Sequence, residues 1–159
     1  MNVVIIAMGR LKESYLADAC AEYLKRLSAF GKAEVIELPP VKLPEEPSEK
    51  QIAAALEAEG EKILEKVPKG AFLTAMCIEG KQQSSEALAR TLQNAANGGF
   101  GTAVFVIGSS YGLCGKVKNA ADLRLSMSEM TFPHQLARVM LLEQIYRAFT
   151  ITDGRKYHK

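Results

Sequence analysis

Two runs of apolar residues, Asn2–Met8 and Thr102–Ile107, constrain the fold more than any other feature of this sequence. After Asn2, the first run contains no polar residue, which is the pattern of a strand buried on both faces. The second run is also typical of a buried strand. A strand covered on both faces lies between layers of helices, as the strands of a parallel sheet do. We therefore expect an α/β fold with a mainly parallel central sheet.

Strands and helices are expected to alternate along the rest of the chain. Three further strands are predicted at Ala33–Leu38, 70–77 and Leu123–Ser126. Helices are predicted at 11–27, 48–66, Ser85–Asn97, 116–122 and 133–149. Residues 39–47 hold four of the six prolines and are expected to be a loop. This order predicts one α/β domain over residues 1–159, with a mainly parallel sheet flanked by helices.

Composition and cysteine usage exclude several classes of protein. Hydrophobic residues make up 48% of the chain and charged residues 24%, as in an ordinary globular protein. No apolar run is long enough for a membrane span, and the first residues lack the basic flank of a signal peptide. The cysteines are odd in number and lack metal-ligand spacing: Cys20, Cys77 and Cys114. We therefore expect a cytoplasmic protein with reduced cysteines and no metal; a redox role for Cys114 is the alternative.

The charge is unevenly distributed along the chain. Residues 116–159 hold eight Lys or Arg against four Asp or Glu, whereas the whole chain has a net charge of only +2. A basic segment suits an anionic macromolecule such as RNA. An ordinary solvated surface is the alternative, and charge alone does not separate the two.

A glycine-bounded turn, Gly108 to Gly112, directly follows the buried strand Thr102–Ile107. Ligands bind at the carboxyl ends of parallel strands, and glycine lets them approach the backbone. Two plain turn glycines are the alternative. The chain has no Gly-x-Gly-x-x-Gly after its first strand, so a dinucleotide-binding Rossmann enzyme is disfavoured.

The segment after the strand Leu123–Ser126 mixes apolar and hydroxyl side chains. An apolar loop with interleaved hydroxyls can form an adenine slot, although each apolar residue alone is equally suited to the core. His134 and Arg138 follow one helical turn apart, and Arg138 is a candidate to hold a phosphate. The tail combines an aromatic ring, an imidazole and an ammonium group that can stack on a base and move a proton: Tyr157, His158 and Lys159.

The final helix is apolar around nearly all of its circumference. A helix that covers one face of a sheet needs only one apolar stripe. We therefore expect this helix to pack against a second subunit as well as the sheet, forming a homodimer. The residues that motivate this prediction are Leu136, Val139, Met140, Leu141, Leu142, Ile145, Tyr146 and Phe149.

Several of these segments resemble the SPOUT superfamily of knotted methyltransferases and, within it, the ribosomal RNA large subunit methyltransferase H family. The resemblance covers the whole chain and is most specific from Thr131-Phe132-Pro133-His134 to Arg138. It also includes Ile78-Glu79-Gly80-Lys81, Phe105-Val106-Ile107-Gly108, Tyr146-Arg147-Ala148 and the terminal Tyr157-His158-Lys159.

The resemblance implies a C-terminal trefoil knot that binds S-adenosylmethionine in a bent conformation. It also implies methylation of N3 of a pseudouridine in bacterial 23S rRNA, which we expect on an assembled ribosomal particle. A knotted tRNA methyltransferase and a non-catalytic ribosome-binding factor are the alternatives. The cofactor contacts carried over from the family are Met76, Gly108, Met127, Ser128, Glu129, Met130, Thr131 and Phe132.

Proton removal from N3 requires a base, or a cation that stabilises the resulting anion. His158 is the first candidate base and His134 the second, with Arg138, Tyr157 and Lys159 as their partners at the acceptor. Ser109 stands where the resemblance leads us to expect a second glycine. Its side chain is expected either to crowd the methionine part of the cofactor or to add a hydrogen bond.

Overall fold

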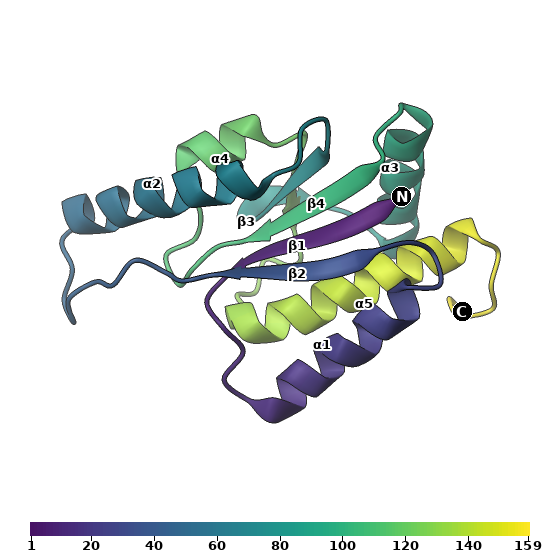
Figure 1. Ribbon diagram of the computed structural model, residues 1–159, viewed down its shortest axis with the longest axis horizontal. Helices are drawn as coiled ribbons and strands as arrows, with labels where there is room; N and C mark the ends of the chain where they lie inside the picture. The colour runs from purple at the N-terminus through teal and green to yellow at the C-terminus, as the bar shows by residue number, and fades with distance from the viewer.

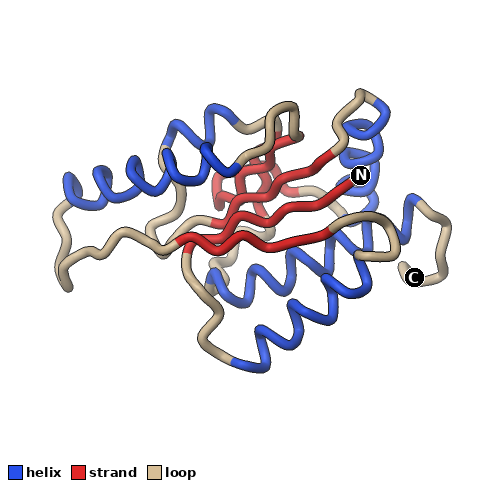
Figure 2. Tube along the Cα trace, in the orientation of Figure 1, coloured by secondary structure: helices blue, strands red, loops and turns tan.

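The computed structural model covers residues 1–159 and contains one sheet of five parallel strands in the order β2-β1-β4-β3-β5. Figures 1 and 2 show the sheet between two layers of helices. The strands are β1 (Asn2–Met8), β2 (Ala33–Leu38), β3 (Phe72–Gln82), β4 (Thr102–Ile107) and β5 (Leu123–Ser126). The helices are α1 (Ser14–Leu27), α2 (Glu49–Lys66), α3 (Ser85–Asn97), α4 (Gly115–Ala120) and α5 (His134–Thr152).

Alternate residues of the central strands enter two separate cores. In β1, Val3 and Ile5 face the core formed with α1, α3 and α5, whereas Val4 and Ile6 face the core formed with α2 and α4. All four side chains are at most 5% exposed. Both faces of β1 are therefore buried, as its uninterrupted apolar run predicts.

Most of the predicted elements form where the sequence places them. β1, β2, β4, β5 and α3 have the predicted bounds, and the Ser48 hydroxyl caps α2 in a capping box with Gln51. Helix α1 begins at Ser14 instead of residue 11, because residues 9–13 form the loop that leaves the sheet. Strand β3 continues to Gln82, five residues beyond its predicted end, and α5 continues to Thr152.

Helix α5 lies between α1 and α3 on one face of the sheet (Figure 1). Leu141, Leu142 and Ile145 are at most 1% exposed, and they belong to the core that α1 and α3 complete. Two neighbouring helices and the sheet thus account for much of the apolar circumference that led us to expect a second subunit. None of the five helices is long and apolar enough to cross a lipid bilayer.

Candidate active site

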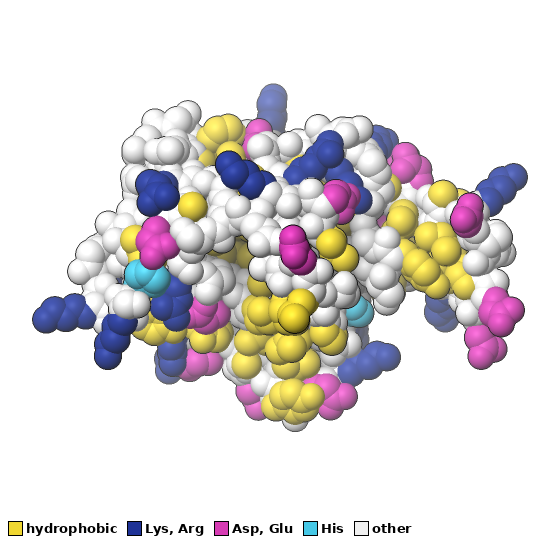
Figure 3. Space-filling model, turned by 180° about the vertical axis from the view of Figure 1, so that it is seen from behind, with side chains coloured by type: hydrophobic (Ala, Val, Ile, Leu, Met, Phe, Trp, Pro, Cys, Tyr) yellow, Lys and Arg dark blue, Asp and Glu magenta, His cyan; other side chains and the backbone are white.

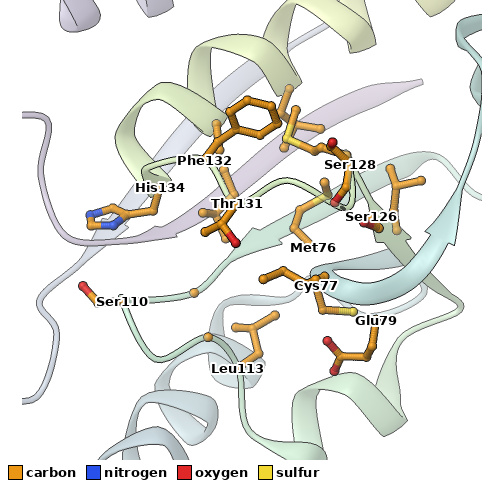
Figure 4. Close-up of a pocket in the computed structure, with 18 of the residues that line it drawn as sticks. Met76, Cys77, Glu79, Ser110, Leu113, Ser126, Ser128, Thr131, Phe132 and His134 are labelled. Carbon is orange, nitrogen blue, oxygen red and sulfur yellow. Dashed lines mark hydrogen bonds between the residues drawn. The ribbon is translucent and has the colours of Figure 1, made fainter.

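A cavity of about 690 Å³ opens at the carboxyl ends of β3, β4 and β5. Because the strands are parallel, the segments that follow them meet at one edge of the sheet. Figure 4 shows Met76 of β3, Leu113 of the segment after β4 and Thr131 of the segment after β5 around the cavity. The predicted cofactor residues that line it are Met76, Gly108, Met127, Ser128, Met130, Thr131 and Phe132. Glu129 is exposed and is not part of the lining.

The turn after β4 leaves no room for a side chain at Gly108. A Cβ atom there would lie 2.2 Å from the carbonyl oxygen of Gly112, so any substitution must open the turn. The Gly112 N–H donates to the Ser109 carbonyl at 2.9 Å, and Gly112 itself has a φ of +89°. This tight glycine turn forms part of one wall of the cavity.

Hydrogen bonds from the last residue of β5 and within the loop itself shape the loop 127–132. The Ser126 hydroxyl donates to the Ser128 carbonyl at 3.1 Å, and the Ser128 hydroxyl accepts from the Met130 N–H at 3.0 Å. The backbone N–H groups of Thr131 and Phe132 donate to no other group of the chain. The loop therefore presents free backbone donors beside apolar side chains.

Residues 77–79 form a further wall that the sequence did not predict. β3 is interrupted by a register shift between Met76 and Lys81, after which it pairs with β5 again. The bulge turns Cys77, Ile78 and Glu79 into the cavity lining. The Glu79 carboxylate pairs with the Lys118 ammonium of α4, which closes this side of the cavity.

His134, the first residue of α5, also lines the cavity. Burial lowers the pKa of its imidazole below the usual value, and the positive charges of Arg138 and Lys12 lower this pKa further. The neutral imidazole therefore predominates at pH 7, and it can accept a proton.

Arg138 does not reach a phosphate from its position in the structure, so this prediction is wrong. Its side chain is only 2% exposed, and its Nη1 lies 2.5 Å from the Glu37 carboxylate of β2. Its Nη2 donates to the Gly9 carbonyl at 2.9 Å. Arg138 thus ties α5 to β2 and to the loop 9–13, whose Arg10 and Lys12 are exposed.

None of the tail residues 157–159 lines this cavity. The His158 Nε2 is 2.7 Å from the Glu86 carboxylate of α3, and its Nδ1 is 3.4 Å from the Arg147 guanidinium. The Tyr157 hydroxyl donates to Glu143 at 3.2 Å, and Lys159 is exposed. Glu143 lines a second cavity of about 320 Å³, which shares Met76 and Met127 with the larger one.

Most of the basic side chains in residues 116–159 are already paired with carboxylates. Five of the eight form ion pairs: Lys116 with Glu61, Lys118 with Glu79, Arg138 with Glu37, Arg147 with Glu143 and Arg155 with Asp153. Arg124 instead donates to Asn119 and to the Lys118 carbonyl. The basic excess counted from the sequence therefore overstates the free positive charge. No group of three or more possible metal-ligating side chains is found.

The chain matches the family model described as "Predicted SPOUT methyltransferase" over residues 1–158. It is 51% identical over 159 residues to the "Ribosomal RNA large subunit methyltransferase H" of Bacillus thuringiensis (strain Al Hakam), with 100% of both chains covered. A protein of the same name from Bacillus anthracis shows the same identity and coverage.

Two solved structures share the fold at low sequence identity. A probable methylase family protein from Haemophilus influenzae Rd KW20 aligns with a TM-score of 0.54 and 15% identity, covering 99% of this chain and 70% of the other. A protein from a structural study of the 2-OH methylation of C/U34 on tRNA aligns with a TM-score of 0.53 and 16% identity, covering 97% and 98%.

Proposed function

Because the chain belongs to the SPOUT methyltransferase family, we propose that it transfers a methyl group from S-adenosylmethionine to N3 of a pseudouridine in 23S rRNA. The family description supports methyl transfer, and the shared name of relatives that are 51% identical along the whole chain supports a large-subunit rRNA as the acceptor. The observation that carries the proposal is the cavity beside β3, β4 and β5, because seven of the eight predicted cofactor residues line it.

The residues around the cavity fit a bent S-adenosylmethionine. The turn at Gly108 presents backbone with no side chain, and the free N–H groups of Thr131 and Phe132 suit the hydrogen-bonding edge of an adenine ring. Partly exposed apolar side chains such as Met127 and Phe132 offer the surface that the ring buries. A volume of about 690 Å³ lies in the usual range for a pocket that binds a small molecule.

Positioning and proton removal are the two tasks left to the chain. Bound S-adenosylmethionine supplies an electrophilic methyl group on a sulfonium. The turn and the loop 127–132 hold the cofactor, and an acceptor nitrogen held in line with that methyl gains rate from proximity. His134 is the neutral base that the cavity offers for the N3 proton. His158 docks on α3, so a role at the acceptor requires the tail to move or to meet a second subunit.

We also propose a homodimer whose interface includes exposed apolar side chains near the cavity. Leu136 of α5 is 40% exposed, and Ile78, Tyr111 and Met130, which line the cavity, are 50–74% exposed. Figure 3 shows hydrophobic side chains gathered in the lower middle of one face, with Lys and Arg scattered around them. Most of the basic side chains in residues 116–159, beside the candidate site, are already paired, so we propose that a folded ribosomal particle, rather than free RNA, is the substrate.

Cofactor binding and methyl transfer test the proposal together. Calorimetry should show saturable binding of S-adenosylmethionine, and mass spectrometry should find N3-methylated pseudouridine after incubation with ribosomal particles that lack the modification. Saturable binding with methylation of isolated tRNA alone would assign a tRNA substrate. No saturable binding and no methylation of either RNA would indicate a non-catalytic ribosome-binding factor.

A further inference from the structure

Glu59 of α2 is a buried carboxylate with no cation beside it. The residue is 3% exposed, and none of the eight ion pairs of the chain includes it. Glu61, two residues further along, is exposed and pairs with Lys116. Burying a carboxylate without a counter-ion is costly unless hydrogen bonds replace its water. The partners of Glu59 therefore indicate what its burial achieves.

Two loops that are far apart in the sequence donate to this carboxylate. The Val41 N–H, in the proline-rich loop 39–47, donates to Oε1 at 2.9 Å. The Ser109 hydroxyl, in the turn after β4, donates to Oε2 at 2.8 Å. Both oxygens are thus used by segments that leave the sheet on either side of β1, one after β2 and one after β4.

Ser109 lies in the turn that forms one wall of the larger cavity. Its carbonyl accepts from Gly112, and Gly108 before it has no space for a side chain. At the far end of the same segment, Cys114 packs against α2 so closely that a Cβ atom on Gly60 would lie 2.3 Å from its Sγ. Helix α2 therefore holds both ends of the segment 109–114, by the hydrogen bond that Glu59 accepts from Ser109 and by packing at Gly60.

We propose that Glu59 is a positioning residue that fixes the turn 108–112 in the conformation required for cofactor binding. The proposal rests on the proposed function, since the cavity is taken to be the site of S-adenosylmethionine. It also explains how a serine is accommodated after Gly108: Glu59 holds the hydroxyl, which secures the turn to α2.

Two substitutions at this position separate hydrogen bonding from packing. In Glu59→Gln, the amide oxygen can still accept from Val41, and the amide nitrogen can donate to the Ser109 hydroxyl, which also acts as an acceptor. In Glu59→Met, a side chain of similar length offers neither bond. Glu57→Met is the matched control, because Glu57 lies on the same helix and is exposed.

The first measurement is made without cofactor, by hydrogen exchange of the backbone amides of residues 109–113. Glu59→Met should speed exchange in this segment while exchange in β1 and β4 stays slow, whereas Glu59→Gln and Glu57→Met should resemble the wild type. Unchanged exchange in a folded Glu59→Met protein overturns the proposal, whether or not the protein binds S-adenosylmethionine.

The second measurement is the affinity for S-adenosylmethionine by calorimetry. Glu59→Met should raise Kd about tenfold or more, which is the effect of losing a hydrogen bond to a charged group. Glu59→Gln should restore most of the affinity. If the wild type binds no cofactor, the proposed function fails; if wild type and Glu59→Met bind equally, only the role of Glu59 fails.

Ser109→Ala tests the same contact from the other side and remains informative if Glu59→Met does not fold. It should reproduce the faster exchange of the turn and the weaker binding, and it should add little to Glu59→Met in the double variant. Wild-type exchange in Ser109→Ala overturns the proposal. So does a full additional loss of affinity in the double variant, because that result assigns the serine to the cofactor itself.

Discussion

The most specific prediction for a single side chain concerns His134. It is the only histidine that lines the larger cavity, and its lowered pKa keeps it neutral at pH 7. Replacing it with Asn should lower the single-turnover rate of methyl transfer about 10²–10⁴-fold, which is the usual contribution of a general base. Single-turnover methylation of ribosomal particles separates this step from product release.

The pH dependence follows from the sign of the pKa change. Burial and two nearby positive charges disfavour the imidazolium, so the base becomes protonated only below the usual histidine pKa. The wild-type rate should therefore be level near pH 7 and fall on the acid side. The same rate is measured for His158→Ala and for a variant that lacks residues 157–159. If they abolish transfer while His134→Asn retains it, the base is in the tail.

We expect Arg138 to stabilise the folded protein and not to bind RNA. It is 2% exposed and its partner Glu37 is 35% exposed, so Arg138→Met leaves a partly solvated carboxylate and removes the bond to Gly9. We expect a loss of about 3 kcal/mol, the low end for breaking a buried pair. Urea unfolding measures it, with Lys116→Met as an exposed control. A midpoint equal to that of the wild type would contradict this role.

Among the structural elements, the turn after β4 is the one most sensitive to substitution. A single methyl group at Gly108 would meet the Gly112 carbonyl, so Gly108→Ala should abolish cofactor binding by opening the turn. Gly101→Ala is the matched control, since nothing lies within 4 Å of the Cβ position there. Calorimetry measures the cofactor affinity of both variants, and circular dichroism checks that both are folded. Wild-type affinity in a folded Gly108→Ala protein would place the cofactor elsewhere.

The strands were predictable where burial alone determines them. β1 and β4 are covered on both faces, so their apolar runs mark their ends closely. The extension of β3 was not predictable, because it depends on a bulge and on pairing with β5 more than 40 residues later, as Lys81 with Leu125. Local sequence does not show such a partner.

The residues of the candidate site also differ in whether they could be predicted from the sequence. The glycine turn and the loop 127–132 follow strands directly, so their place at the sheet edge follows from topology. Glu59 could not be identified, because Glu57, Glu59 and Glu61 look alike in the sequence, and only one of them is buried. Arg138 was misassigned because its partner, Glu37, lies 101 residues away.

At the scale of the whole molecule, the proposed homodimer is testable with a single substitution. Leu136 is a better probe of the proposed interface than Leu142, because Leu136 is 40% exposed and Leu142 is fully buried. Leu136→Glu should convert a dimer to a monomer without unfolding it, since the exposed side chain contributes little to the core. Light scattering at micromolar concentration measures the mass. A monomeric wild type would refute the dimer itself.

The ion pairs of residues 116–159 have a consequence for how RNA binding responds to salt. A cation already matched by a carboxylate displaces no additional counterion when it approaches a phosphate. Within this segment, three unpaired groups contribute about −2 to the slope of log K against log salt, whereas all eight would contribute about −6. Titrating an rRNA fragment at several potassium concentrations, with Arg124, Lys156 and Lys159 replaced by Gln as a comparison, measures this contribution. A triple variant whose slope is smaller in magnitude than that of the wild type by about 2 shows that these three groups meet phosphates when the protein binds RNA.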